Sequence, residues 1–111
     1  MNINEFIENN AIAILAKADL RYKRFDIIKK DIELESYNLF EQLILFGSVE
    51  NLFESVNGQI LPRIWTQGNT KCVLCQPNDE QIVALFYDNY MDAKDNYLYA
   101  KQLDSLLKEL F

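Results

Sequence analysis

Two cysteines three positions apart have the spacing in this sequence that most invites a chemical role. Cys72 and Cys75 match the C-x-x-C pattern of thiol redox motifs and of zinc ligand pairs. A structural zinc needs four ligands, but the chain has no second cysteine pair and no histidine. Both cysteines also fall inside a predicted strand, where residues three apart face opposite sides, about 10 Å apart, and cannot form a disulfide. We interpret them as ordinary strand cysteines.

Histidine is absent from all 111 residues, which removes the commonest general base and every Ser-His or Cys-His arrangement. A cation could be held by Asp88, Asp92 and Asp95, but they lack the alternating spacing and the glycine of a calcium loop. The three glycines are scattered, and none precedes a Lys-Ser/Thr pair as in a phosphate-binding loop. The sequence therefore predicts a protein that is not an enzyme, with no catalytic residue, metal ligand or cofactor site.

The charge of the chain is acidic overall but unevenly distributed. Eleven basic residues oppose 17 acidic ones, which gives a net charge of −6. Because such a chain repels phosphate backbones and anionic lipids on average, we expect no nucleic-acid partner and no membrane insertion. Residues 17–30 reverse the trend, with six cations against two carboxylates. They indicate either a solvated hairpin face or a patch for an acidic partner, formed by Arg21, Lys23, Arg24, Lys29 and Lys30.

Targeting features are not evident in the sequence. The first residues lack a cationic segment followed by an apolar one, and no window approaches the roughly 18 apolar residues of a membrane span. We therefore expect a cytoplasmic protein. The length predicts a single domain over residues 1–111, which is large enough to bury a normal hydrophobic core.

The amino-terminal part predicts a helix followed by a β-hairpin. Residues 2–10 have a capping-box-like start and a shared apolar face. Residues 11–18 alternate partly, as a strand does, although one continuous helix over 2–19 also fits the apolar spacing. A turn at 19–22 and a strand at 24–28 complete the hairpin.

The helix predicted over residues 36–56 is apolar on too many sides to be covered by one sheet. At about 100° per residue, the four residues 43–46 point to all sides of the helix. This surplus indicates a second covering surface, either another element or another chain. We therefore expect a partner interface on this helix, formed by Phe40, Leu43, Ile44, Leu45 and Phe46.

The carboxyl-terminal part predicts a three-stranded antiparallel meander and a final helix. The strands cover 63–66, 70–76 and 81–88, and the last is apolar enough to lie centrally in a sheet. Residues 76–79 have the form of a type I turn with proline at its second position. Asp92 is placed to cap the last helix. These elements predict an α+β fold with a five-stranded antiparallel sheet flanked by helices.

This order of elements resembles the roadblock/dynein light chain family, whose topology is similar to longin and profilin-like folds. The resemblance covers nearly the whole chain and is best at Leu61-Pro62-Arg63-Ile64-Trp65, Thr70-Lys71-Cys72-Val73-Leu74, Ile82-Val83-Ala84-Leu85-Phe86 and Leu106-Leu107-Lys108-Glu109-Leu110. The family usually has an Asp-Gly turn in its first hairpin. Here Asp19-Leu20-Arg21 stands in that place, without glycine.

The resemblance implies a non-catalytic protein that forms a homodimer, or a heterodimer with a similar subunit, through its second helix and a strand edge. Many proteins of this family bind or regulate small Ras-like GTPases, or act as scaffolds of signalling and motility complexes. On this chain the matching strand adds Arg63, Ile64 and Trp65 to the interface of helix 36–56. The expected function is thus a dimeric scaffold or adaptor that acts on a small GTPase.

Two other functions stay open at the level of sequence. A ligand-sensing, profilin-like module would line a pocket with aromatic residues such as Trp65, Phe86 and Tyr87. A small acidic inhibitor of a basic protein would use the net negative charge of the chain. The sequence does not distinguish a homodimer from half of a heterodimer, because both bury the same kind of apolar surface.

Overall fold

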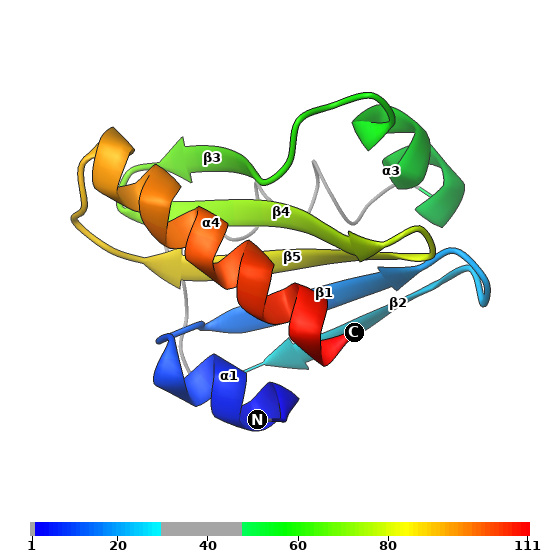
Figure 1. The fold of residues 1–111 in the computed structure, drawn as a ribbon, viewed down its shortest axis with the longest axis horizontal. Coiled ribbons are helices and arrows are strands. Elements are labelled where there is room, and N and C mark those ends of the chain that lie inside the picture. The colour runs from blue at the N-terminus through cyan, green and yellow to red at the C-terminus, as the bar shows by residue number, and fades with distance from the viewer. Residues whose placement is uncertain (1, 30–47) are drawn as a thin grey trace.

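The computed structural model describes residues 2–29 and 48–111, and it has the α+β architecture expected from the sequence (Figure 1). Its elements in chain order are α1 (Ile3–Asn9), β1 (Ile14–Asp19), β2 (Arg24–Lys29), α3 (Val49–Val56), β3 (Arg63–Gln67), β4 (Thr70–Asn78), β5 (Gln81–Asp88) and α4 (Ala93–Leu110). The expected first helix, hairpin, meander and final helix are therefore confirmed.

The alternative of one continuous helix over 2–19 is wrong. The side chain of Asn2 caps α1 by accepting a 2.9 Å hydrogen bond from the Glu5 N–H, and the helix ends at Asn9. The chain then turns through Ala11, whose φ of 52° lies in the left-handed region and cannot continue a right-handed helix. The apolar residues that follow enter β1 because they pair with neighbouring strands on both sides.

The helix expected over 36–56 is also wrong in its extent. Ser48 has an extended backbone, and its hydroxyl oxygen accepts a 3.1 Å hydrogen bond from the Asn51 N–H. Ser48 is therefore the N-cap of α3, which begins at Val49. The apolar spacing continues across Ser48, and this spacing alone carries no information about a capping side chain. Residues 36–47 of the expected helix lie outside the described residues.

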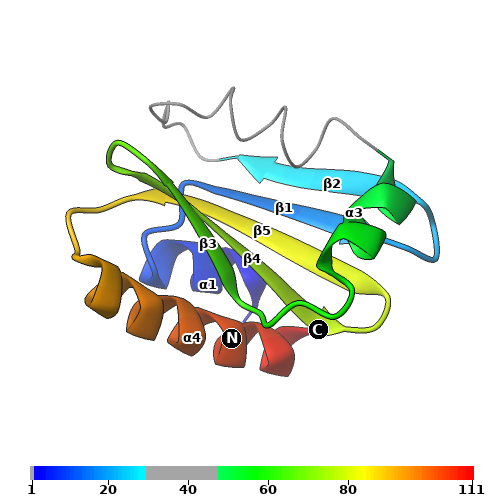
Figure 2. The same cartoon turned by 90° about the horizontal axis from the view of Figure 1, so that it is seen from above.

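The five strands form one antiparallel sheet in the order β2-β1-β5-β4-β3. The last strand of the chain, β5, lies in the middle, as its apolar density predicts. Strand β1 pairs with β2 through a hairpin and with β5 across the chain, where Ile14 opposes Phe86. Figure 2 shows α1 and α4 together on one face of the sheet. Among the strands described, β2 and β3 lie at the two edges.

Each face of the sheet has its own hydrophobic core, because successive strand residues point to opposite sides. The core under α1 and α4 consists of Phe6, Ile7, Ile12, Leu15, Val73, Cys75, Val83, Leu85, Tyr87, Ala100, Leu103 and Leu107. The core on the other face, under α3, consists of Ala13, Ile14, Ala16, Ala18, Val49, Val56, Cys72, Leu74, Ile82, Ala84 and Phe86. Burial on both faces explains why β1, β4 and β5 are nearly continuous apolar runs.

The turn between β4 and β5 differs from the expectation for residues 76–79. Strand β4 continues to Asn78, and only Asp79 and Glu80 form the turn. Pairing between β4 and β5 shifts register between Cys75 and Asn78. Because Pro77 lacks an N–H, such an irregularity lets it lie within the strand without breaking a regular ladder bond. The turn therefore lies later in the chain than the sequence predicts.

Helix α4 is fixed at both its start and its inner face. The Asp92 carboxylate accepts a 2.8 Å hydrogen bond from the Asp95 N–H, which confirms the expected N-cap. Ala100, Leu103 and Leu107 are fully buried against the sheet. The Tyr99 hydroxyl donates a hydrogen bond to the Asn10 carbonyl oxygen, which ties α4 to the end of α1.

Candidate protein-binding surfaces

The turn between β1 and β2 gathers cations around one tyrosine. Lys23 takes a left-handed φ of 54°, which reverses the chain at this point. Tyr22 is exposed, and the guanidinium carbons of Arg21 and Arg24 lie 5.6 and 5.8 Å from its ring centroid. The negative face of the ring attracts both cations, so the side chains cluster. We call Arg21, Tyr22, Lys23 and Arg24 the basic turn.

Two cations of the basic turn have acidic neighbours. Arg24 Nε lies 3.2 Å from Asp26 Oδ2, and Lys23 Nζ lies 3.6 Å from Glu50 Oε1 on α3. Both pairs are solvent-exposed and contribute little to stability, so a partner could replace them at low cost. The structure thus brings together three of the five residues of the expected patch. The remaining two fall beyond what is described: the Lys29 side chain and Lys30.

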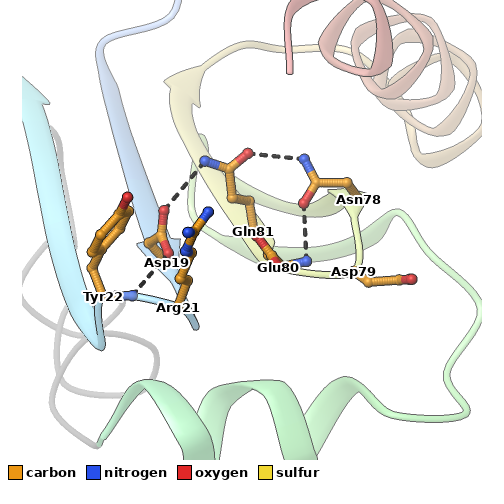
Figure 3. Close-up of a pocket in the computed structure, with 7 residues that line it drawn as sticks. All are labelled: Asp19, Arg21, Tyr22, Asn78, Asp79, Glu80 and Gln81. Atoms are coloured by element: carbon orange, nitrogen blue, oxygen red, sulfur yellow. Dashed lines mark hydrogen bonds between the residues drawn. The ribbon is translucent and has the colours of Figure 1, made fainter.

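A hollow of about 510 Å³ lies beside the basic turn, where the β1–β2 and β4–β5 turns meet (Figure 3). Buried Asp19 holds its wall together by accepting hydrogen bonds from the Tyr22 N–H at 3.1 Å and from Gln81 Nε2 at 3.4 Å. Asn78 continues the wall by donating to Gln81 Oε1 at 2.8 Å. The lining residues are Asp19, Arg21, Tyr22, Asn78, Asp79, Glu80 and Gln81.

The chemistry of this hollow is polar and mixed in charge. Among its described lining residues, the carboxylates come from Asp19, Asp79 and Glu80 and the cation comes from Arg21. The Asp19 carboxylate already accepts hydrogen bonds from the wall, so it acts as a structural brace. A partner that contacts the basic turn could therefore also contact the polar residues of this hollow.

Strand β3 presents the second candidate surface, at an edge of the sheet. Within the described residues β3 pairs only with β4, so its outer backbone edge faces away from the sheet. Ile64 packs on the core under α4, whereas Trp65 packs on the opposite core. The guanidinium carbon of Arg63 lies 5.1 Å from the Trp65 ring centroid. Ile60, just before the strand, is almost fully exposed.

The expected interface is only partly described. Arg63, Ile64 and Trp65 lie on the edge strand, where pairing with another chain can occur. The other expected interface residues lie outside the described residues: Phe40, Leu43, Ile44, Leu45 and Phe46.

The two cysteines occupy opposite cores and have no bond to each other. Cys72 lies on the face under α3, and Cys75 lies on the face under α4. Burial raises the pKa of both thiols well above 9.0, and the Asp104 carboxylate raises the pKa of Cys75 further. Because the thiolate is the reactive form, neither cysteine is poised for redox or nucleophilic chemistry. The interpretation as strand cysteines is confirmed.

Two of the three aspartates considered as a cation site have other roles. Asp88 accepts a 2.7 Å hydrogen bond from the Thr70 hydroxyl, and Asp92 caps α4. In the described part of the chain no group of three or more acidic or cysteine side chains could hold a metal ion. No helix there is long and apolar enough to cross a membrane.

The three aromatic residues of the ligand-sensing alternative do not share one face of the sheet. Phe86 belongs to the core under α3, whereas its neighbour Tyr87 belongs to the core under α4. The Tyr87 hydroxyl donates a 2.9 Å hydrogen bond to Asn96 Oδ1, which is also buried. Adjacent strand residues cannot line one cavity on a single face.

Sequence reasoning missed the hollow and its polar wall. Asp19 and Gln81 are far apart in the chain and meet only through the pairing of β1 with β5. The available signal was the Asn-Asp-Glu run at 78–80, which is typical of a turn, but nothing local connects it with the first hairpin.

Strand order and helix placement together define a roadblock/longin-like fold. Among solved structures the chain is similar to Myxococcus xanthus MglB, with a TM-score of 0.53 and 8% sequence identity. The likeness covers 95% of this chain and 80% of that chain. At this identity it shows the fold alone, and it confirms the fold implied by the resemblance. No protein-family model and no curated protein matches the sequence.

Proposed function

We propose that this protein is a non-catalytic cytoplasmic adaptor that acts as a dimer and regulates a small Ras-like GTPase. The observation that supports dimerisation is the outer edge of β3, which pairs with no other described strand and lies beside exposed Ile60 and half-buried Trp65. An exposed edge strand is a template for pairing with a second chain. The GTPase as partner comes from the resemblance to the roadblock family.

The proposed dimer joins the β3 strands of two chains around a twofold axis, so that each strand contributes the same surface. The partner is a second copy or a similar subunit. A stable interface buries at least about 1,000 Å² in total, which one short strand does not supply. We therefore include the apolar residues of 40–46 in the interface, as the sequence predicts.

Light scattering on a sizing column tests this proposal directly. A mass of about 26 kDa, twice the 13.0 kDa of one chain, is expected across a range of concentrations. Ile60 and Thr66 are both exposed, and replacing them with lysine puts charge next to and on the pairing edge, which should yield the monomer. Asn4→Lys on α1, a lysine added on another element, is the control and should leave the mass unchanged. A wild-type monomer at all concentrations would refute the dimer.

The GTPase interaction has its own test. The basic turn would meet an acidic surface, so Arg21→Glu with Arg24→Glu should weaken binding of a Ras-like GTPase by about tenfold or more. Titration of GDP-loaded and GTP-analogue-loaded forms would show which state is preferred. If no Ras-like GTPase from the source organism binds the intact dimer, the regulatory role is wrong while dimerisation can still hold.

A further inference from the structure

Exposed apolar side chains are concentrated where α4 begins. In the parts of the chain that are described, seven large hydrophobic side chains are exposed, and four of them fall within nine residues. Their exposed fractions are 89% for Tyr90, 43% for Met91, 45% for Tyr97 and 55% for Leu98. Single exposed apolar residues are ordinary, but a cluster of this kind marks an interaction surface.

The lysines of α4 all lie on the same side of the helix. Lys94, Lys101 and Lys108 are seven residues apart, and seven residues are almost two full turns, so they form a nearly straight row. Tyr97 and Leu98 stand three and four positions after Lys94 and flank this row. The opposite side of the helix is the one buried on the sheet. We call Lys94, Tyr97, Leu98 and Lys101 the outer stripe.

Charge in the outer stripe is available to a partner. Lys108, beyond the stripe, is already paired with Asp104 at 3.3 Å. Lys101 Nζ lies 5.6 Å from the Tyr97 ring centroid, and Lys94 has no acidic partner within the residues described. The two lysines of the stripe are thus separated by about 10 Å along the helix, with the apolar pair between them.

We propose that the outer stripe binds an acidic amphipathic helix of another protein. The apolar face of such a helix would cover Tyr97 and Leu98. Together with Lys94 and Lys101 these residues have the i, i+3, i+4, i+7 spacing of one helix face. Its carboxylates would pair with Lys94 and Lys101. The chain as a whole has a net charge of −6, so an acidic partner is repelled by most of the surface and is favoured where lysines cluster, as at the stripe.

A narrow partner fits this surface better than a flat one. Asp95 and Glu109 are exposed on the flanks of the same helix, and Asp92 lies at its start. An anionic membrane would contact these carboxylates together with the lysines and gain little. A single helix lying along the stripe avoids them. The proposal also stands apart from dimerisation through β3, because it needs only one copy of the chain.

The test is fluorescence anisotropy with a labelled synthetic peptide of about 20 residues that has one leucine stripe and glutamates on both flanks. We expect saturable binding that weakens as salt is raised. Lys94→Glu with Lys101→Glu should weaken it by about tenfold or more, and the same peptide with lysines in place of glutamates should then bind this variant. Tyr97→Ser with Leu98→Ser should also weaken it.

The matched control is Arg21→Glu with Arg24→Glu, which changes the net charge equally at the opposite end of the molecule (Figure 1). It should alter peptide affinity less than about twofold, because the added charges lie more than a Debye length from the stripe. Far-UV circular dichroism checks that each variant is folded. The proposal is overturned if the acidic peptide does not bind, if both double variants weaken it equally, or if vesicles of phosphatidylcholine and phosphatidylserine bind the stripe and the peptide does not.

Discussion

Alkaline pH should destabilise this protein through its two buried thiols. Burial raises the pKa of Cys72 and Cys75 in the folded state above the ordinary value of 9.0. Below pH 9 both states hold these protons, and the full stability is present. As the pH rises past 9, the unfolded chain releases them first, so the free energy of unfolding falls and continues to fall up to the folded-state pKa.

The size of this effect follows from the number of thiols. A difference of one pH unit is worth about 1.4 kcal/mol per group when only the unfolded state ionises. At pH 10, one unit above the ordinary thiol pKa of 9.0, each cysteine should therefore cost about 1.4 kcal/mol and the pair about 3 kcal/mol. Burial also raises the pKa of Tyr87 from its ordinary 10.0. Ionisation of this tyrosine in the unfolded chain therefore lowers the free energy of unfolding mainly above pH 10.

Urea unfolding at about pH 7.5 and pH 10, under reducing conditions, measures the loss. Wild type should lose about 3 kcal/mol between the two pH values. The variant Cys72→Ala with Cys75→Ala should be less stable at both, because it leaves small cavities, but should lose much less between them. Each single variant should lose about half as much as wild type. An equal loss in the wild type and the double variant would show that other groups cause the alkaline instability.

Three further outcomes are expected from equilibrium unfolding. Leu103→Ala removes a fully buried side chain under α4 and should cost about 2–5 kcal/mol, so a cost below about 1 kcal/mol would mean that α4 packs loosely. Asp92→Ala should cost about 1 kcal/mol through loss of the α4 cap, whereas Asp92→Ser, which also caps, should cost less. Lys23→Gly should raise stability by about 0.5–1 kcal/mol because glycine takes the left-handed φ of 54° without strain, and Lys23→Val should lower it. The exposed pair with Glu50 that both Lys23 variants lose contributes little.

Local sequence patterns predicted most of the elements because they depend on neighbours in the chain. The cap at Asp92, the strand alternation around Cys72 and the dense apolar run of β5 are visible over a few residues. The failures came where two local signals compete. At Ser48 a helix cap interrupts a segment whose apolar spacing predicts one continuous helix. At Pro77, a residue that usually marks a turn lies within β4 at a strand irregularity.

The surfaces were less accessible to sequence reasoning than the fold. Arg21, Lys23 and Arg24 could be grouped in advance because they belong to one turn. The hollow depends on the register that brings Asp19 next to Gln81, and periodicity does not fix the pairing of distant strands. The outer stripe of α4 is hard to predict because the apolar spacing of that helix identifies its buried side and carries no information on which exposed residues bind a partner.

The position of β5 in the middle of the sheet has a consequence for how the chain folds. The hairpin of β1 and β2 can form early, but β1 gains its second partner only when β5 is available, and Ile14 pairs with Phe86 across most of the chain. Closing so large a loop is slow, because its entropic cost precedes the contacts that compensate for it. During synthesis the edge of β1 that pairs with β5 therefore stays unpaired until the meander has emerged from the ribosome.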